Sequence, residues 1–197
     1  YAVETDDGYD FTGNMQYVKQ FVEAADYAVA NLETTLSGNE NGYEYDGYPN
    51  FNSPDSVVDS IQYAGFDMLL LANNHCYDHR TWGLKRTIQV VTEKGLAHLG
   101  TRADTNGRTY QVVEINGVKV GMLNYTYEIG TGGKVGINGI TVSEADVPLV
   151  DTFNENNLDV FYENVSNRMA ELKAEGADLV VAYIHWGVEY QLEPTQT

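Results

Sequence analysis

Two carboxamides and an imidazole stand together at Asn73, Asn74 and His75, directly after an apolar run at residues 68–72. An uninterrupted apolar run without a polar face is typical of a strand buried on both faces of a parallel sheet. In open α/β sheets, ligands bind just past the carboxyl ends of such strands. The position of these three side chains therefore indicates a binding or catalytic site.

The same pattern occurs at two further places in the chain. The apolar run 27–30 leads into Asn31 and Glu33, and the run 179–184 leads into His185. Parallel strands of one sheet place their carboxyl ends along the same edge. We therefore predict that the three strand ends converge at one edge of one sheet.

Glu33, Asn74 and His185 offer a carboxylate, a carboxamide oxygen and an imidazole nitrogen. This mixture of oxygen and nitrogen donors favours Mn, Fe or Zn over Ca, which prefers oxygen ligands alone. A divalent metal here would polarise a phosphoryl or acyl oxygen, or would supply hydroxide near neutral pH. His75 would then protonate a leaving group or stabilise charge on a transferred oxygen. The alternative is that these groups only cap strand ends, with His185 a hydrogen-bonded histidine of the core.

Three neighbours of this set, Asn31, Asn73 and Trp186, are predicted to contact a substrate.

Cys76 is the only cysteine, so an intrachain disulfide is excluded. Because Cys76 follows the candidate histidine, it is a candidate nucleophile. A lone cysteine near a strand end more often fills space in the core, and this is the stronger interpretation.

The chain carries 11 Lys and Arg residues against 29 Asp and Glu residues, which gives a net charge of -18 over 197 residues. This charge repels phosphate backbones, so we expect no binding of nucleic acid. It also opposes binding of an anionic polymer unless a cation screens the site.

Hydrophobic residues make up 43% of the chain, which suffices for residues 1–197 to bury a core as a single domain. No apolar stretch reaches the length of a membrane span.

Hydrophobic periodicity predicts the elements that position these side chains. It indicates helices at 14–25, 53–65, 81–94 and 158–175, with Ser53 capping the second and Gly65 ending it. It indicates strands at 27–31, 67–72, 96–99 and 178–184, with His98 half-buried in the third. A hairpin with a tight Asn-Gly turn is expected at 110–115 and 118–123, and long loops at 37–52 and 128–143. This alternation favours a layered α/β domain.

Several sequence blocks occur together in an order that resembles one bacterial family. They are Ala28–Thr34, Gly47–Pro54, Gly65–Asp67, Leu71–His75 and His185–Tyr190. Together they resemble the capsule-synthesis proteins of the CapA type, which are associated with poly-γ-glutamate capsules. That family is similar to a divergent branch of the calcineurin-like metallophosphatase superfamily, and the resemblance covers nearly the whole chain.

The resemblance implies a four-layer α/β/β/α sandwich with a site at the carboxyl edges of its sheets. Glu33 matches a metal-bridging acid, Asn74 an Asn ligand, His185 a later His ligand and His75 the proton-donating His. The family's opening Gly-Asp pair and its closing Gly-His-x-His segment have no match in the chain, which is therefore expected to be the central portion of the domain, truncated at both ends. A divalent metal (Mn, Fe or Zn) is expected in the complete protein, and weak or no metal binding in this chain alone.

The resemblance also implies a role in poly-γ-glutamate capsule biosynthesis or export. The first hypothesis is a metal-dependent hydrolase or transferase that acts on a phosphoester or on an amide of a γ-linked glutamyl polymer. The alternatives are a non-catalytic component that binds polymer or assembly proteins, and a purely structural domain. The expected partners are an anionic polymer or phosphoester and other capsule-assembly proteins. The expected location is extracellular or at the cell surface, with membrane anchoring only through segments outside residues 1–197.

Overall fold

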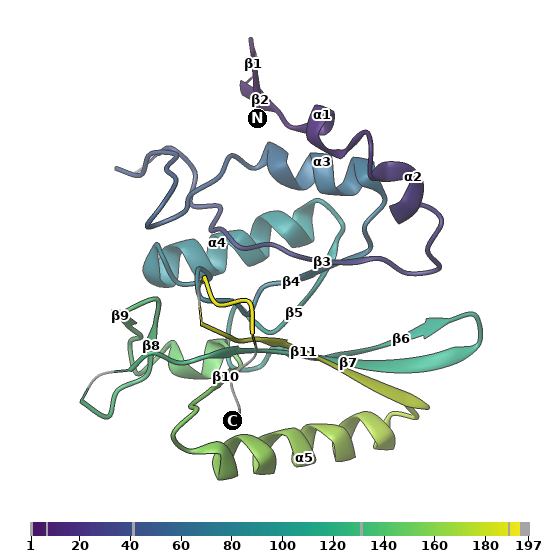
Figure 1. Cartoon of the computed structure of the whole chain (residues 1–197), viewed down its shortest axis with the longest axis vertical. Helices are drawn as coiled ribbons and strands as arrows, with labels where there is room; N and C mark the ends of the chain where they lie inside the picture. Colours follow the sequence, from purple (N-terminus) through teal and green to yellow (C-terminus); the bar gives the residue numbers. More distant parts are fainter. Residues whose placement is uncertain (1, 7, 41, 131, 189, 194–197) are drawn as a thin grey trace.

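The chain folds into four layers, α/β/β/α, as the resemblance to the capsule-synthesis family implies. The computed structural model describes residues 2–6, 8–40, 42–130, 132–188 and 190–193. Figure 1 shows two helices above a first sheet, a second sheet beneath it, and one long helix below the second sheet. Each sheet is thus covered by helices on its outer side and faces the other sheet on its inner side.

The first sheet is built from alternating strands and helices. Its three parallel strands lie in the order β3 (Val29–Asn31), β4 (Met68–Leu70) and β5 (Ala97–Leu99). The connecting helices α3 (Ser56–Ala64) and α4 (Arg80–Glu93) cover its outer face (Figure 1). Because parallel neighbours need a crossover, this βαβαβ order places all three carboxyl ends on one side.

The boundaries of α3 are partly as predicted. Gly65 ends the helix in the left-handed conformation (φ 96°), and its N–H bonds back to the last turn. The prediction that Ser53 caps the helix is wrong, because α3 begins only at Ser56. The Ser53 hydroxyl lies instead 3.0 Å from the Thr34 hydroxyl, which ties the loop before α3 to the segment after β3.

The second sheet is centred on β7 (Val118–Tyr127). Its partners are antiparallel β6 (Gln111–Ile115) and parallel β10 (Thr152–Phe153) and β11 (Leu179–His185). Asn116 (φ 50°) and Gly117 (φ 82°) form the predicted tight turn between β6 and β7. The helix α5 (Leu158–Ala174) covers the outer face of this sheet (Figure 1).

Two predicted segments differ from the structure. The helix predicted at 14–25 is two short helices, α1 (Thr12–Met15) and α2 (Lys19–Val22), without a buried residue. Met15 packs against the core, but Tyr17 and Phe21 remain exposed, so the apolar positions do not form one buried face that would stabilise a continuous helix. The loop predicted at 128–143 contains a hairpin of β8 (Gly136–Ile137) and β9 (Ile140–Thr141), because Ile137 is fully buried in the core.

The remaining elements are small. They are the hairpin β1 (Val3–Thr5) and β2 (Gly8–Asp10) and the 3₁₀-helix η1 (Val147–Leu149). None of the helices within the described ranges is long and apolar enough to cross a membrane.

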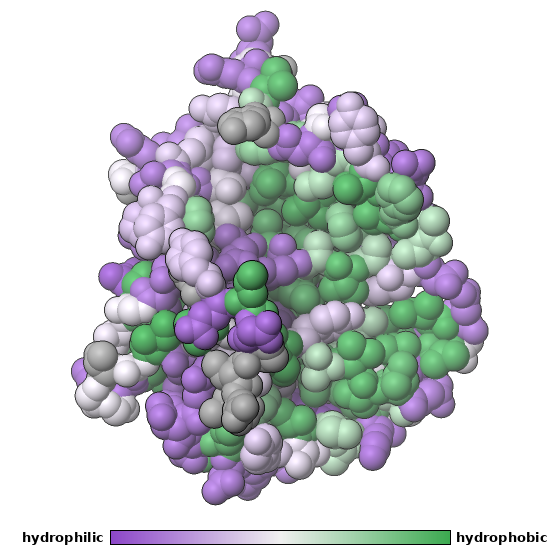
Figure 2. All heavy atoms as spheres, in the orientation of Figure 1, coloured by the Kyte–Doolittle hydropathy of each residue, from purple (hydrophilic) through white to green (hydrophobic). Residues whose placement is uncertain are grey.

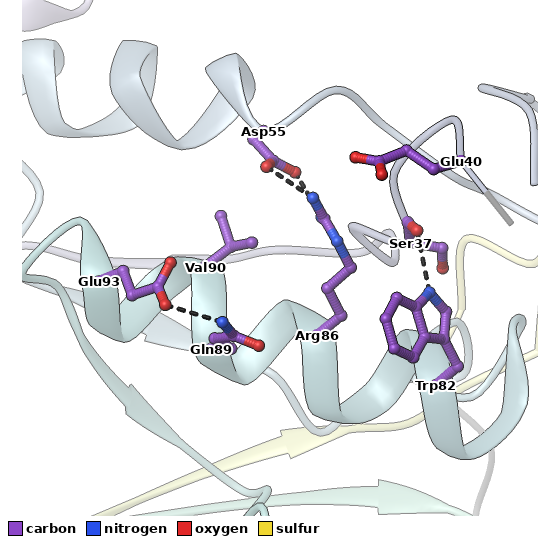
Figure 3. Close-up of a pocket in the computed structure, with 8 residues that line it drawn as sticks. All are labelled: Ser37, Glu40, Asp55, Trp82, Arg86, Gln89, Val90 and Glu93. Carbon is purple, nitrogen blue, oxygen red and sulfur yellow. Dashed lines mark hydrogen bonds and ion pairs between the residues drawn. The ribbon is translucent and has the colours of Figure 1, made fainter.

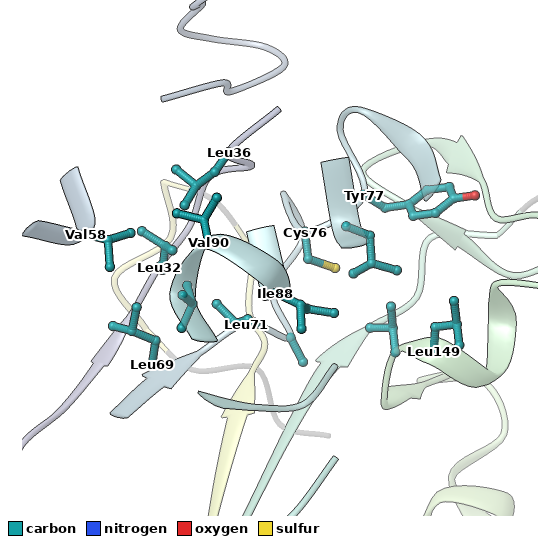
Figure 4. Packing of buried hydrophobic residues seen from close by; sticks show 14 of the residues in the cluster. Leu32, Leu36, Val58, Leu69, Leu71, Cys76, Tyr77, Ile88, Val90 and Leu149 are labelled. Atoms are coloured by element: carbon teal, nitrogen blue, oxygen red, sulfur yellow. The ribbon is translucent and has the colours of Figure 1, made fainter. Parts of the chain in front are cut away.

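The largest core lies between the first sheet and its helices. Figure 4 shows Leu69 and Leu71 packed with Val90 and Ile88 of α4, and Cys76 lies in the same cluster. Burial raises the pKa of the Cys76 thiol to about 12, so the sulfur is protonated and unreactive at neutral pH. The structure thus agrees with the space-filling interpretation of this cysteine.

The face of the molecule in Figure 2 divides into an apolar and a polar half. In the view of Figure 2, hydrophobic residues spread over the right half, where Figure 1 places the amino ends of the parallel strands and the β6–β7 hairpin. Hydrophilic residues gather on the left half, where the carboxyl ends of β3, β4 and β11 lead into loops. Polar groups therefore concentrate at the edge that the sequence predicts for the site.

We expect the protein to lose stability as the pH falls below 6.5, in part through His98 in β5. Its Nδ1 is buried and, within the described residues, has no hydrogen-bond partner. Burial lowers the pKa of His98 from its ordinary value of 6.5, so the unfolded chain binds a proton that the folded chain resists. The stabilisation from neutral His98 is complete above pH 6.5 and is lost as the pH falls through that value.

Urea unfolding at pH 7.5 and at pH 5.5 tests this expectation. The free energy of unfolding should decrease between the two pH values, and His98→Gln should remove part of the decrease. An identical decrease in His98→Gln and in the parent protein would show that His98 does not titrate on unfolding.

Candidate functional site

The three predicted strand ends meet, but they come from two sheets. His185 Nε2 at the end of β11 lies 2.9 Å from Asn74 Oδ1 and 3.6 Å from Glu33 Oε1. Glu33 and Asn74 follow strands of the first sheet, whereas β11 belongs to the second. The prediction of one sheet is wrong because the β6–β7 hairpin starts a second sheet, whose parallel strands end on the same side (Figure 1).

The surroundings of His185 favour a neutral imidazole. Burial lowers its pKa below the ordinary value, while the nearby Glu33 carboxylate opposes this effect and His75 adds to it. The ring also stacks on Tyr127, with 6.4 Å between the ring centroids and an interplanar angle of 11°. A neutral imidazole held in this way keeps a ring nitrogen lone pair for a ligand or a hydrogen bond.

His75 is held by a buried carboxylate that sequence reasoning missed. Its Nδ1 lies 2.7 Å from Asp78 Oδ2, and both side chains are buried. Asp78 also accepts hydrogen bonds from the Phe51 N–H (2.8 Å) and from Asn138 Nδ2 (3.1 Å). The Phe51 ring packs against the imidazole, with 4.4 Å between centroids. A carboxylate on Nδ1 fixes the orientation of the ring and leaves Nε2 as the nitrogen available to a reacting group.

The sequence carried only weak signals for these supporting residues. Asp78 follows His75 by three residues, a spacing that one turn of chain brings together, but acids are frequent in this chain. Asn138 (φ 50°) lies in the turn of the β8–β9 hairpin, within a glycine-rich segment that the sequence predicted as a loop. Phe51 contributes its backbone N–H, which no residue pattern reveals.

Asn73 joins the two strand ends of the first sheet. It is fully buried, and its Nδ2 donates to Asn31 Oδ1 (3.0 Å) and to the Leu32 carbonyl (2.9 Å). Its Oδ1 accepts the His75 N–H at 3.1 Å. In turn, Asn31 Nδ2 donates to Glu33 Oε2 at 2.8 Å. These bonds position the site, and the contact of Asn31 and Asn73 with a substrate stays a prediction.

Trp186 lies at the rim of the site and is 44% exposed. Its indole N–H donates to Glu155 Oε1 at 2.5 Å, and its ring meets Phe153 edge-on at 6.0 Å between centroids. An anchored and partly exposed indole can offer apolar surface to a ligand. Its contact with a substrate also stays a prediction.

Asn124, within β7, connects the two sheets directly behind the site. Its Oδ1 accepts the N–H of Ala72 at 2.8 Å, and its Nδ2 donates to the carbonyls of Ala72 (3.2 Å) and Tyr183 (3.3 Å). Ala72 immediately precedes Asn73, and Tyr183 lies two residues before His185. A Cβ at Gly100 would lie 2.4 Å from Asn124 Oδ1, so only glycine leaves room for this bridge. One carboxamide thus sets the distance between the two halves of the site.

We expect Asn124→Leu to lower the free energy of unfolding by about 1–3 kcal/mol, because it leaves the buried polar backbone groups of Ala72 without partners. Urea unfolding measures the change. Asn106→Leu is the matched control, since Asn106 is exposed and should change stability by less than about 0.5 kcal/mol. Equal effects of the two substitutions would contradict the bridging role of Asn124.

The converging donor atoms fit part of a divalent-metal site. A carboxylate, a carboxamide oxygen and a neutral imidazole are ligands that Mn, Fe and Zn accept. Within the ranges that the structure describes, no group of three or more His, Cys, Asp or Glu side chains is arranged to hold a metal. The donors that do come together are those of Glu33, Asn74 and His185, and one of these three is a carboxamide.

Comparison with known proteins identifies the family. The family model described as "Bacterial capsule synthesis protein PGA_cap" matches residues 1–197. The capsule biosynthesis protein CapA of Bacillus anthracis is 30% identical over 185 residues, which are 91% of this chain and 42% of that protein. The PGA biosynthesis protein CapA of Bacillus subtilis (strain 168) is 28% identical over 183 residues, 91% of this chain and 43% of that protein. The chain spans less than half the length of these relatives.

A solved structure agrees with the four-layer architecture. The 5'-nucleotidase precursor from Thermus thermophilus superposes with a TM-score of 0.51 and 15% sequence identity, over 95% of this chain and 34% of that chain. At this identity the likeness concerns the fold alone, and it agrees with the layered α/β/β/α architecture of the chain. With the match along its whole length, the chain belongs to the bacterial capsule-synthesis protein family.

Proposed function

We propose that this chain supplies the central part of a metal-dependent hydrolase or transferase site that acts in capsule biosynthesis. The observation that carries the proposal is the meeting of Glu33, Asn74 and His185 beside the His75–Asp78 pair. Metal donors and a proton donor are the two parts that such a reaction requires. The membership of the family and the names of its relatives supply the biological setting.

In this proposal Glu33, Asn74 and His185 hold a divalent metal (Mn, Fe or Zn), and further ligands complete the site. When bound, the metal acts as a Lewis acid on a phosphoryl or acyl oxygen of the substrate. Asp78 holds His75 through Nδ1, so that His75 delivers a proton from Nε2 to the leaving group. Phe51 and Asn138 restrict this pair to one arrangement.

The substrate that we propose is a phosphoester or an amide of a γ-linked glutamyl polymer. Relatives of this chain are named for capsule biosynthesis and for PGA biosynthesis, which favours a reaction on the polymer or on its precursors. By the same reasoning the partners are other capsule-assembly proteins and the place of action is the cell surface.

A second candidate is a non-catalytic component that binds polymer or assembly proteins. The observation that favours it is the small number of charged or imidazole donors. Beside the Asn74 carboxamide, the described residues that meet there provide one carboxylate, Glu33, and one imidazole, His185. The direct Asn74–His185 contact of 2.9 Å also satisfies both groups without a metal.

An assay of the natural full-length protein separates the two candidates. The protein is stripped with a chelator, reloaded with Mn²⁺ or Zn²⁺, and offered a chromogenic phosphodiester and a γ-linked glutamate polymer. We expect turnover of one of them that depends on the metal and is lost in His75→Ala. Polymer binding without turnover by the loaded protein would overturn the catalytic proposal in favour of the second candidate.

A further inference from the structure

A cavity lies between the start of α4, the β8–β9 hairpin and the chain leading to η1. Its volume is about 570 Å³, and its lining includes Arg80, Lys134, Thr81 and Ser143. Glu144 is the one acid among the described residues that line it. The cavity therefore carries more positive than negative charge in a chain whose net charge is -18.

The two cations that line this cavity are the side chains of Arg80 and Lys134. Within the described part of the chain, neither the Arg80 guanidinium nor the Lys134 ammonium takes part in a hydrogen bond or an ion pair. Several other basic residues are paired, as Arg108 is with Glu175 (2.6 Å) and Arg168 with Glu171 (3.0 Å). Unpaired cations in so acidic a protein are available for an anionic ligand.

A neighbouring pocket shows the contrast. It has a volume of about 220 Å³ and also contains an arginine, Arg86 (Figure 3). There the guanidinium donates to both carboxylate oxygens of Asp55, at 2.6 and 2.9 Å, and Glu40 and Glu93 add negative charge. Figure 3 shows this arginine turned to Asp55, so the described residues of that pocket leave no cation for an anion.

The wall of the Arg80–Lys134 cavity is rigidly built. The buried Asp146 lies behind it and accepts hydrogen bonds from three hydroxyls, those of Tyr77 (2.7 Å), Ser143 (2.8 Å) and Thr81. These bonds stabilise the ionised Asp146 carboxylate and hold α4 against the segment that follows β9. Arg80 itself has φ 57°, a conformation that is costly for a residue with a side chain and that is concentrated at functional sites.

The cavity and the candidate site share the β8–β9 hairpin. Lys134 and Thr141 of this hairpin segment line the cavity, while Asn138 in its turn donates to Asp78 at 3.1 Å. On the other side, Arg80 follows Asp78 by two residues. The β8–β9 hairpin and the turn that leads from His75 to Arg80 therefore connect the cavity to the residues that support His75.

We propose that the Arg80–Lys134 cavity binds carboxylates of an anionic polymer next to the bond held at His75. The proposal rests on the proposed function, and it assigns the polymer rather than an isolated phosphoester as the ligand. It also explains how a chain with a net charge of -18 can hold a polyanion, since the repulsion is offset locally by two unpaired cations.

The test is equilibrium binding to the full-length protein by calorimetry at low salt. The probes are a γ-linked glutamate octamer and inorganic phosphate. We expect R80Q/K134Q to weaken octamer binding at least tenfold and to reduce its salt dependence. The control K119Q/K173Q removes two exposed cations that do not line the cavity, and it should change affinity less than twofold. Thermal unfolding of both variants checks that they fold.

The outcomes separate this proposal from the proposed function. Equal weakening by the two double variants would overturn the cavity as a site, since only net charge would matter. Phosphate binding as tight as octamer binding, and equally sensitive to R80Q/K134Q, would overturn the polymer as its ligand. Octamer binding that requires Arg80 and Lys134 in a protein without metal-dependent turnover would support the cavity and refute the proposed reaction.

Discussion

His75→Ala should lower turnover by about 10²–10⁴-fold, the range that general acid catalysis contributes, and should leave the metal content unchanged. The reason is that His75 is bonded to Asp78 through Nδ1 and offers its other nitrogen to the leaving group, whereas the proposed metal donors are different side chains. Steady-state kinetics on the loaded full-length protein, with elemental analysis of the same samples, measures both quantities.

His98→Ala is the control for the loss of a partly buried imidazole, because the His98 ring, in β5, makes no hydrogen bond or ring contact with the site side chains within the described residues. It should affect stability and leave turnover per folded molecule within a factor of about two. A His75→Ala protein that kept full turnover would contradict the proton-donor role. A loss of metal in that variant would instead make His75 a ligand.

His185→Ala should lower both metal affinity and turnover. Removing a partner of a metal ligand costs about 10–100-fold in affinity or activity, so loss of a direct donor should cost at least that much. Glu33→Ala should behave in the same way, since its carboxylate lies 3.6 Å from His185. Metal titration with Mn²⁺ and kinetics at saturating metal distinguish weak binding from slow turnover.

Glu93→Ala is a matched control for Glu33→Ala, because Glu93 is exposed at the end of α4. It should leave metal affinity unchanged. If His185→Ala and Glu33→Ala also bound Mn²⁺ as the parent protein does, the meeting of these donors would have only a structural role. The non-catalytic candidate would then be the better description.

The strand ends of the site could be predicted from the sequence because each follows an apolar run that only a buried strand accommodates. Met68–Leu70 and Leu179–His185 are strands in the structure, and Asn74 and His185 do come together. The local patterns do not specify which sheet a strand joins. That choice depends on β7, whose pairing with β6 and β11 creates the second sheet.

The support of the site could not be predicted, because it consists of contacts between distant segments. Asn124 and Ala72 are 52 residues apart, and Asn138 and Asp78 are 60 apart. The strand predicted at 118–123 continues to Tyr127 as β7, and Asn124 within it turns its carboxamide toward the other sheet. The helix predicted at 14–25 is wrong for a related reason, since periodicity does not reveal which of its apolar positions meet the rest of the fold.

The most direct test of the proposed metal site is a crystal structure of the full-length protein loaded with Mn²⁺, with anomalous diffraction to locate the metal. We expect an anomalous peak within coordination distance of Asn74 Oδ1, a His185 ring nitrogen and the Glu33 carboxylate. The present 2.9 Å contact between Asn74 and His185 should open to admit the ion. An active, loaded protein with its metal elsewhere, and with that contact intact, would contradict the account.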